Sequence, residues 1–135
     1  TLDKRLQLFE PVEFVLQFLK DRLQFTRKDA KIALHATCST RKMGLDAKLR
    51  ELALLCVTEV VVPENIFCCG FAGDRGFNFP ELNESALHGL ADQVQGCEAG
   101  YSTSKTCEVG LALHGHIPYR SIFALVDEVT TPLAR

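Results

Sequence analysis

The sequence predicts one α/β domain, a small parallel β-sheet with flanking helices. Its 135 residues are enough for one compact domain with its own core and too few for two. Short apolar or β-branched runs alternate with longer segments of helical periodicity, an order typical of parallel sheets covered by helices. The cysteine-bearing loops follow predicted strands, and loops after parallel strands meet at one edge of a sheet. We therefore expect these loops to converge at the carboxyl ends of the strands.

Four short segments have the character of strands. Residues 31–35 form an apolar run typical of a buried strand, and residues 59–62 are rich in β-branched side chains. Pro63 ends the second of these runs because proline cannot donate a backbone hydrogen bond. Residues 99–102 are expected to form a third strand, and residues 117–119 are expected to be extended.

Segments with helical spacing lie between and around these strands. Residues 1–27 are expected to form an N-terminal helix that leads into the domain, with Pro11 in its first turn marking the actual start. Apolar residues share one face of a helix predicted over residues 45–56, and Cys56 on that face is expected to pack in the core. Further helices are predicted over residues 81–94, 107–114 and 122–129.

The composition excludes several classes of partner. With 47% hydrophobic residues, 24% charged residues and a net charge of −2, the chain is typical of soluble globular proteins and offers no surface for nucleic acid. No apolar run approaches the roughly 20 residues of a transmembrane helix, so no membrane-spanning segment is expected. The first residues are charged and no signal-peptide core follows them, which predicts a cytoplasmic location.

Four of the six cysteines lie in predicted loops or at predicted helix starts, namely Cys38, Cys68, Cys69 and Cys107. Thiolates are the preferred ligands of iron–sulfur clusters and of zinc, and four of them close a site. A helix N-terminus lowers the pKa of a thiol and so favours the form that binds metal. The sequence therefore predicts a metal site made by these four side chains. The alternative role for a cysteine is to pack, inert, in the core. We expect this role only for Cys56, and the role of Cys97 stays open between metal binding and packing.

Other residues near these cysteines are candidates for supporting roles. Gly70, Gly73 and Gly76 are expected to shape the loop, because glycine lets the backbone approach sulfur and donate amide hydrogens to it. His35 precedes Cys38 in a His-x-x-Cys arrangement. It is either an additional ligand, a partner of a ligand, or a hydrogen-bonded histidine at a strand end.

The arrangement of these motifs resembles a known family. Cys38, the run Cys68-Cys69-Gly70-x-Ala72-Gly73, and Ser104-x-x-Cys107 resemble the cysteine-rich CCG domain. That domain occurs in the heterodisulfide reductases and in iron–sulfur subunits of glycolate, lactate and anaerobic glycerol-3-phosphate dehydrogenases. The 29 residues between Cys38 and Cys68 are slightly fewer than the family's usual spacing, whereas the 34 residues between Cys69 and Ser104 match it.

More narrowly, residues 35–44, 68–76 and 100–110 are similar to the C-terminal end of large FAD-linked oxidases, the quinone-linked D-lactate or D-2-hydroxyacid dehydrogenases. The resemblance implies that residues 1–135 are one CCG-type domain of a larger enzyme. Flavin and ferredoxin-like domains would lie upstream in the same chain, and FAD would bind only there. This domain would bind iron–sulfur and transfer electrons toward a quinone or another acceptor. The whole enzyme would be cytoplasmic or peripheral at the inner face of the membrane, and the domain alone would hold no catalytic residue.

One departure from the family pattern concerns the last motif. The wider family has Cys-x-x-Cys where this chain has Ser104-Lys-Thr-Cys107, so a cluster with five cysteine ligands would lack one. The remaining four would suit a [4Fe–4S] cluster or a single tetrahedral ion, with Ser104 or His35 as a supplement. Two alternatives remain: a structural zinc site that shapes a docking face, and a heterodisulfide-reductase-like thiol redox site using Cys68 or Cys69. The isolated fragment could also hold no metal.

Overall fold

A four-stranded parallel sheet forms the centre of the molecule in a computed structural model, which describes residues 3–134. Its strands, in the spatial order β3-β2-β4-β5, are β3 (Val57–Val61), β2 (Lys28–Leu34), β4 (Ala99–Ser102) and β5 (Tyr119–Ser121). The chain leaves β2 toward one edge, to β3, and then returns to the other side of β2 for β4 and β5. The order therefore reverses between β2 and β4, and such a reversal opens a crevice at the carboxyl ends of the two strands.

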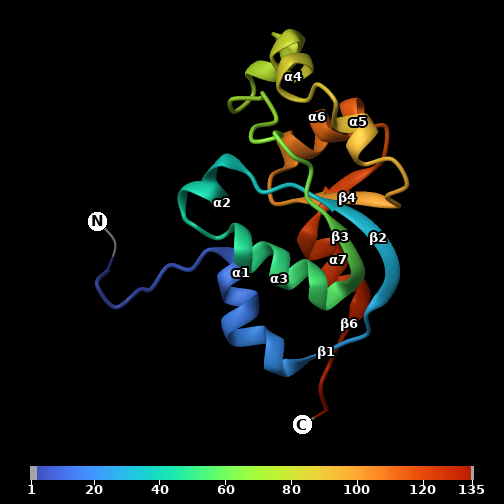
Figure 1. Cartoon of the computed structure of the whole chain (residues 1–135). Helices are drawn as coiled ribbons and strands as arrows, with labels where there is room; N and C mark the ends of the chain where they lie inside the picture. The colour runs from blue at the N-terminus through green and yellow to red at the C-terminus, as the bar shows by residue number, and fades with distance from the viewer. Residues whose placement is uncertain (1–2, 135) are drawn as a thin grey trace.

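Helices cover both faces of this sheet (Figure 1). On one face lie α3 (Asp46–Cys56), α7 (Ile122–Val129) and α1 (Pro11–Phe14). On the other lie α5 (Leu90–Gln93), α6 (Lys105–Gly115) and, beyond them, α4 (Pro80–Ala86). The predicted α/β fold with a small parallel sheet and flanking helices is thus confirmed.

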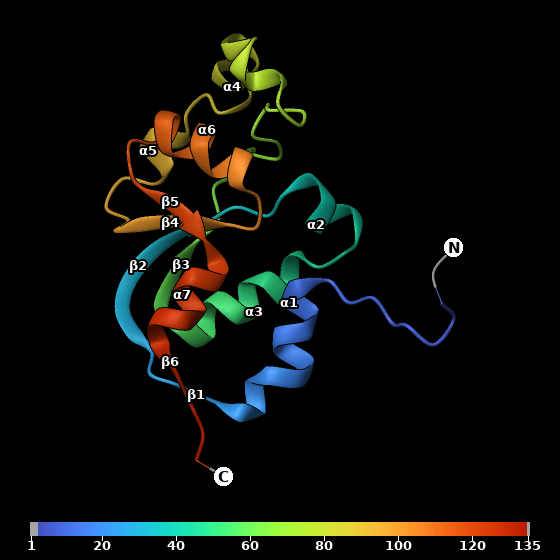
Figure 2. The ribbon, with the colours of Figure 1, turned by 180° about the vertical axis from the view of Figure 1, so that it is seen from behind.

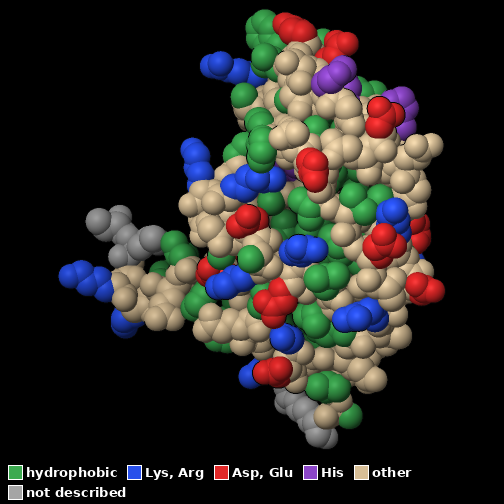
Figure 3. Space-filling model, viewed as in Figure 1, with side chains coloured by type: hydrophobic (Ala, Val, Ile, Leu, Met, Phe, Trp, Pro, Cys, Tyr) green, Lys and Arg blue, Asp and Glu red, His purple; other side chains and the backbone are tan. Residues whose placement is uncertain are grey.

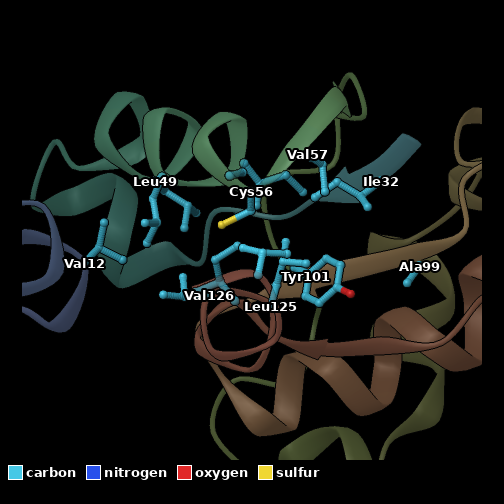
Figure 4. Close-up of a cluster of buried hydrophobic side chains, with 14 of the residues drawn as sticks. Val12, Ile32, Leu49, Cys56, Val57, Ala99, Tyr101, Leu125 and Val126 are labelled. Carbon is cyan, nitrogen blue, oxygen red and sulfur yellow. The ribbon is translucent and has the colours of Figure 1, made fainter. Parts of the chain in front are cut away.

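The two faces bury separate clusters of apolar side chains because successive strand residues point to opposite sides. In β2, Ile32 and Leu34 belong to the cluster under α3 and α7, whereas Ala33 belongs to the cluster under α5 and α6. Cys56 is fully buried in the first cluster, where Figure 4 shows its sulfur pointing between α3 and α7. The prediction that Cys56 packs in the core is confirmed.

Shorter elements complete the fold. After α1 the helix continues as a π-turn, η1 (Val15–Leu19), and a 3₁₀ turn, η2 (Lys20–Arg22). Two further short helices are α2 (Cys38–Lys42) and the 3₁₀ turn η3 (Arg75–Phe77). At the end of the molecule away from α4, β1 (Leu23–Phe25) pairs antiparallel with β6 (Thr130–Pro132), as Figure 2 shows from behind.

Several boundaries differ from the sequence predictions. The helix expected within residues 1–27 begins at Pro11, while residues 1, 2 and 135 lie outside the described part of the chain. The single helix expected over residues 81–94 is two helices, because Gly89 takes a left-handed conformation (φ 80°) at the start of α5. Helix α6 begins at Lys105 rather than Cys107, and β5 lies at Tyr119–Ser121 rather than 117–119. The β1–β6 pair was not predicted, since three-residue strands carry no periodic signal.

Tyr119 buries a hydroxyl that has no hydrogen-bond partner among the described residues. Burial also raises the pKa of this phenol above its usual range. An unpaired buried hydroxyl destabilises the fold, so we expect Tyr119→Phe to raise the free energy of unfolding by about 1 kcal/mol. Urea unfolding of the two proteins measures this change, and a loss of stability would show that the hydroxyl has a partner, such as a bound water.

Candidate metal centre

Three separate chain segments bring four cysteines to the carboxyl end of the sheet. Cys38 is the first residue of α2, directly after β2, and Cys107 lies in the first turn of α6, directly after β4. Cys68 and Cys69 lie in the loop between β3 and α4. The Sγ atoms of Cys38 and Cys68 are 3.7 Å apart, and those of Cys69 and Cys107 are 2.8 Å apart. The loops predicted to converge therefore do so, at the carboxyl end of the sheet.

The four thiols form two pairs of different character. Cys38 and Cys68 are exposed, whereas Cys69 and Cys107 are buried at 3% and 8% exposure. Within residues 3–134, no group of three or more histidine, cysteine or acidic side chains is arranged to hold a metal ion. A shared centre would therefore require the two pairs to draw together around it.

The Cys68-Cys69-Gly70 turn is held by close backbone packing against α4. Gly70 has a left-handed conformation (φ 77°), and its amide donates a hydrogen bond to Cys68 Sγ at 3.3 Å. The buried Asn83 of α4 donates from Nδ2 to the carbonyl oxygen of Cys69 at 2.6 Å. These two contacts fix the Cys69–Gly70 peptide unit, directly after the two adjacent cysteines. The role of Asn83 was missed, because one asparagine in an exposed-looking helix carries no distinguishing signal.

The other two glycines of the loop differ in their surroundings. Gly76 is buried, and a Cβ there would meet Asn83 Oδ1 at 2.5 Å and the Phe71 ring at 2.7 Å. Gly73 has φ 81° but open space around the position of a Cβ. Both therefore fit the predicted loop-shaping role, Gly76 by close packing and Gly73 by backbone conformation.

Hydrogen bonds separate the pKa values of the buried pair. The hydrogen bond between the two sulfurs, together with backbone N–H groups including that of Phe71, lowers the pKa of Cys69 to about 6. The same hydrogen bond, followed by burial, raises the pKa of Cys107 above its usual range. Burial, followed by the contact with Cys68, raises the pKa of Cys38. In the metal-free chain, the buried pair thus holds one thiolate next to one thiol.

A cluster of hydroxyl groups connects the loops that carry Cys38 and Cys107. Thr37 caps α2 by accepting a hydrogen bond from the Thr40 amide at 3.3 Å. The Thr103 hydroxyl, in the loop after β4, lies 3.3 Å from the hydroxyls of both threonines. Because Thr37 adjoins Cys38 and Thr103 lies shortly before Cys107, this cluster fixes the spacing of the two loops.

His35 is buried at the carboxyl end of β2, with 4% exposure. Its Nδ1 lies 3.4 Å from Ser102 Oγ, and its Nε2 has no partner among the described residues. Burial, followed by the positive charge of Arg41, lowers the pKa of His35 to about 4, so the ring is neutral near pH 7. A neutral imidazole with one free nitrogen is suited to a ligand or to a hydrogen bond with one.

Ser104 is the residue before α6, and its side chain makes no hydrogen bond to the helix backbone. Its hydroxyl lies 3.3 Å from Thr106 Oγ1. A hydrogen bond from Ser104 to Cys107 partly offsets the larger effects that raise the pKa of that thiol. The structure therefore places Ser104 beside the predicted ligand set. In the described part of the chain, the one side-chain hydrogen bond of His35 goes to Ser102 and none goes to the four cysteines.

Within residues 3–134, the remaining two cysteines make no hydrogen bond to either pair. Burial raises the pKa of Cys56 to about 12 and also raises the pKa of Cys97. Cys97 is 7% exposed and belongs to the apolar cluster under α5 and α6. High thiol pKa values and apolar surroundings are typical of structural cysteines. The role of Cys97, which the sequence left open, is therefore packing.

No family model matches the chain, and no curated protein or solved structure matches it significantly. No helix within residues 3–134 is long and apolar enough to cross a membrane. Function is therefore inferred from the residues themselves.

The chemistry of the donor set fits a thiophilic metal. Two sulfurs lie at the starts of helices, two share a turn whose backbone amides face sulfur, and one buried histidine nitrogen is free. The amide donors favour the thiolate form that metals bind, whereas the two thiols at the helix starts, Cys38 and Cys107, have raised pKa values in the metal-free chain. Oxygen ligands typical of calcium or magnesium are not part of the set.

Proposed function

We propose that this chain is a metal-binding electron-transfer domain, and that Cys38, Cys68, Cys69 and Cys107 hold an iron–sulfur cluster in its native setting. The observation that carries the proposal is the contact of thiols from three different segments at the reversal of strand order. The resemblance to the CCG domain suggests the wider context, an FAD-linked, quinone-coupled D-lactate or D-2-hydroxyacid dehydrogenase. In that context the flavin and ferredoxin-like domains upstream are its electron-transfer partners.

The residues of this chain have distinct tasks in the proposed site. The four cysteines supply thiolates, and the Gly70 amide stabilises negative charge on Cys68. Asn83 fixes the Cys69 carbonyl, and the threonine cluster fixes the loops. When bound, an iron–sulfur cluster supplies one-electron transfer. Because Cys38 and Cys68 are exposed, the side of the site that they form is the one nearest to an incoming redox partner.

A structural zinc site is a second candidate, and one distance favours it. Zinc–sulfur bonds of about 2.3 Å place two sulfurs of a tetrahedral site about 3.8 Å apart. The Cys38–Cys68 distance of 3.7 Å matches this edge. In a [4Fe–4S] cluster each thiolate binds a different iron, so the sulfurs lie further apart.

A thiol redox site is a third candidate, favoured by the short distance in the buried pair. Cys69 and Cys107 face each other at 2.8 Å from different segments, and the Cys69 thiolate is the nucleophile of the two. Its attack on an external disulfide would form a mixed disulfide and release one thiol. Attack by the deprotonated Cys107 would then form the Cys69–Cys107 bond and release the second thiol.

Metal analysis and the absorption spectrum of anaerobically purified protein distinguish the three candidates. We expect iron and sulfide in the protein, with broad visible absorption that dithionite bleaches. Colourless protein with one zinc per chain would support the structural site instead. Metal-free protein that oxidised glutathione converts to a Cys69–Cys107 disulfide would support the thiol redox site.

Substitutions test whether the four cysteines share one centre. We expect Cys68→Ser and Cys107→Ser each to lose most of the bound metal, because each removes one thiolate of a closed set. Cys56→Ala is the matched control, since Cys56 lies in the cluster under α3 and α7 while the buried pair lies in the cluster under α5 and α6, and it should keep its metal. Full metal content in both serine variants would show that the centre is not shared.

A further inference from the structure

A groove on the α3 side of the molecule is lined by none of the cysteines. It has a volume of about 710 Å³, within the range of small-molecule sites. It is lined by residues of α3, by Leu34 at the end of β2 and by Val62 directly after β3. Its floor is apolar and formed by Leu34, Ala36, Ala47, Leu49, Leu54, Leu55 and Val62. Figure 3 shows this face, where apolar side chains lie among charged ones over α3.

Three arginines line the same groove, Arg27, Arg41 and Arg50. Arg27 and Arg50 are exposed, and neither forms an ion pair within residues 3–134. Arg41 is held in place, since its Nε donates to the Ala36 carbonyl at 3.2 Å and its guanidinium lies 5.1 Å above the Phe67 ring.

Two acidic residues, Asp46 and Glu51, also line the groove. Glu51 lies 3.5 Å from Lys20 Nζ, so its charge is already compensated. Asp46 lies one turn before Arg50 on α3 and so faces the same side of the helix. Neither acid forms an ion pair with Arg27 or Arg50 within residues 3–134, and three arginines against two acids leave the lining with one net positive charge.

We propose that this groove binds an amphipathic anion, an acyl chain with a carboxylate or phosphate head. The chain would lie on the leucines of the floor, and the anionic head would be held by Arg27 and Arg50. Guanidinium groups bind such heads with two parallel hydrogen bonds. An apolar floor without these arginines would not distinguish an acid from an alcohol, and the arginines without the floor would bind any small anion. This inference does not depend on the metal centre.

Octanoate, titrated into the full chain and followed by amide NMR shifts, tests the proposal. We expect saturable shifts at Leu54, Leu55 and Val62, with binding at least about fivefold weaker for octan-1-ol, which has the same chain without the charge. Because exposed charged hydrogen bonds contribute modestly, Arg27→Gln and Arg50→Gln should each weaken octanoate about fivefold. Arg120→Gln is the matched control, an exposed arginine outside the groove, and should change nothing.

Two results would overturn the proposal. Equal affinity for octanoate and octan-1-ol would remove the role of the arginines, and shifts confined to residues outside the groove would remove the site. Vesicles of phosphatidylglycerol identify the source of the ligand. If the protein sediments with the vesicles and octanoate prevents this, the ligand is a membrane lipid. If the protein binds octanoate but does not sediment with the vesicles, the ligand is a free acid.

Discussion

Gly70→Ala is expected to lower the free energy of unfolding by about 3–4 kcal/mol and to abolish metal binding at the proposed centre. A Cβ at this position would overlap the carbonyl oxygen of Leu82 and lie 2.7 Å from its carbon, so backbone rather than a flexible side chain must move. The left-handed backbone (φ 77°) adds a cost of about 1–2 kcal/mol for any residue with a Cβ. Urea unfolding measures the stability, and metal analysis measures the site.

Gly73→Ala is the matched control for this prediction. Its backbone is also left-handed (φ 81°), but nothing lies within 4 Å of the added Cβ. The free energy of unfolding of Gly73→Ala should therefore fall only by the cost of the left-handed backbone, about 1 kcal/mol, and metal binding at the proposed centre should be kept. Equal losses at the two glycines would show that the packing of the loop on α4 does not matter.

Gly100→Ala is expected to cost about 3 kcal/mol, for a purely steric reason. Gly100 lies in the interior strand β4, and a Cβ there would overlap the ring of Tyr119 on the neighbouring strand β5. Overpacked interiors lose stability because the backbone or a side chain must leave its preferred position. Urea unfolding again measures the loss.

A second substitution identifies the cause of that loss. Tyr119→Leu removes the ring and should recover part of the stability of Gly100→Ala, whereas Tyr119→Phe keeps the ring and should recover no steric strain. The interaction between the two positions appears as non-additivity in a double-mutant cycle. If the changes in the free energy of unfolding at the two positions were additive, the overlap between the Cβ and the ring would not be the cause of the loss.

The sequence predicts the sheet better than the site. Ile32 and Leu34 in β2 and the apolar face of α3 follow periodicities that burial imposes directly, and the structure confirms both. The convergence of Cys38 and Cys107 could be predicted because both follow parallel strands. What periodicity cannot show is which sulfurs contact which, since that depends on the path of a loop with no repeating pattern.

Residues that act through single contacts were also beyond sequence reasoning. Asn83 supports Cys69 through one hydrogen bond, and Thr103 supports Cys38 through a hydroxyl cluster. Each contact joins positions that are distant in the sequence, so no local spacing reveals it. The groove lined by Arg27 and Arg50 is hidden for the same reason, because its two sides come from different elements.

The division of the interior into two clusters has a consequence for how a ligand enters the cysteine site. Among the described residues, the cluster under α3 and α7 contains 17 buried side chains, whereas the cluster under α5 and α6, on the cysteine side, contains 11. Regions with less buried apolar surface open at lower free energy than the rest of a protein. We therefore expect the cysteine side to open locally while the sheet and the larger cluster stay folded, so that loading of the proposed metal does not require the whole domain to refold.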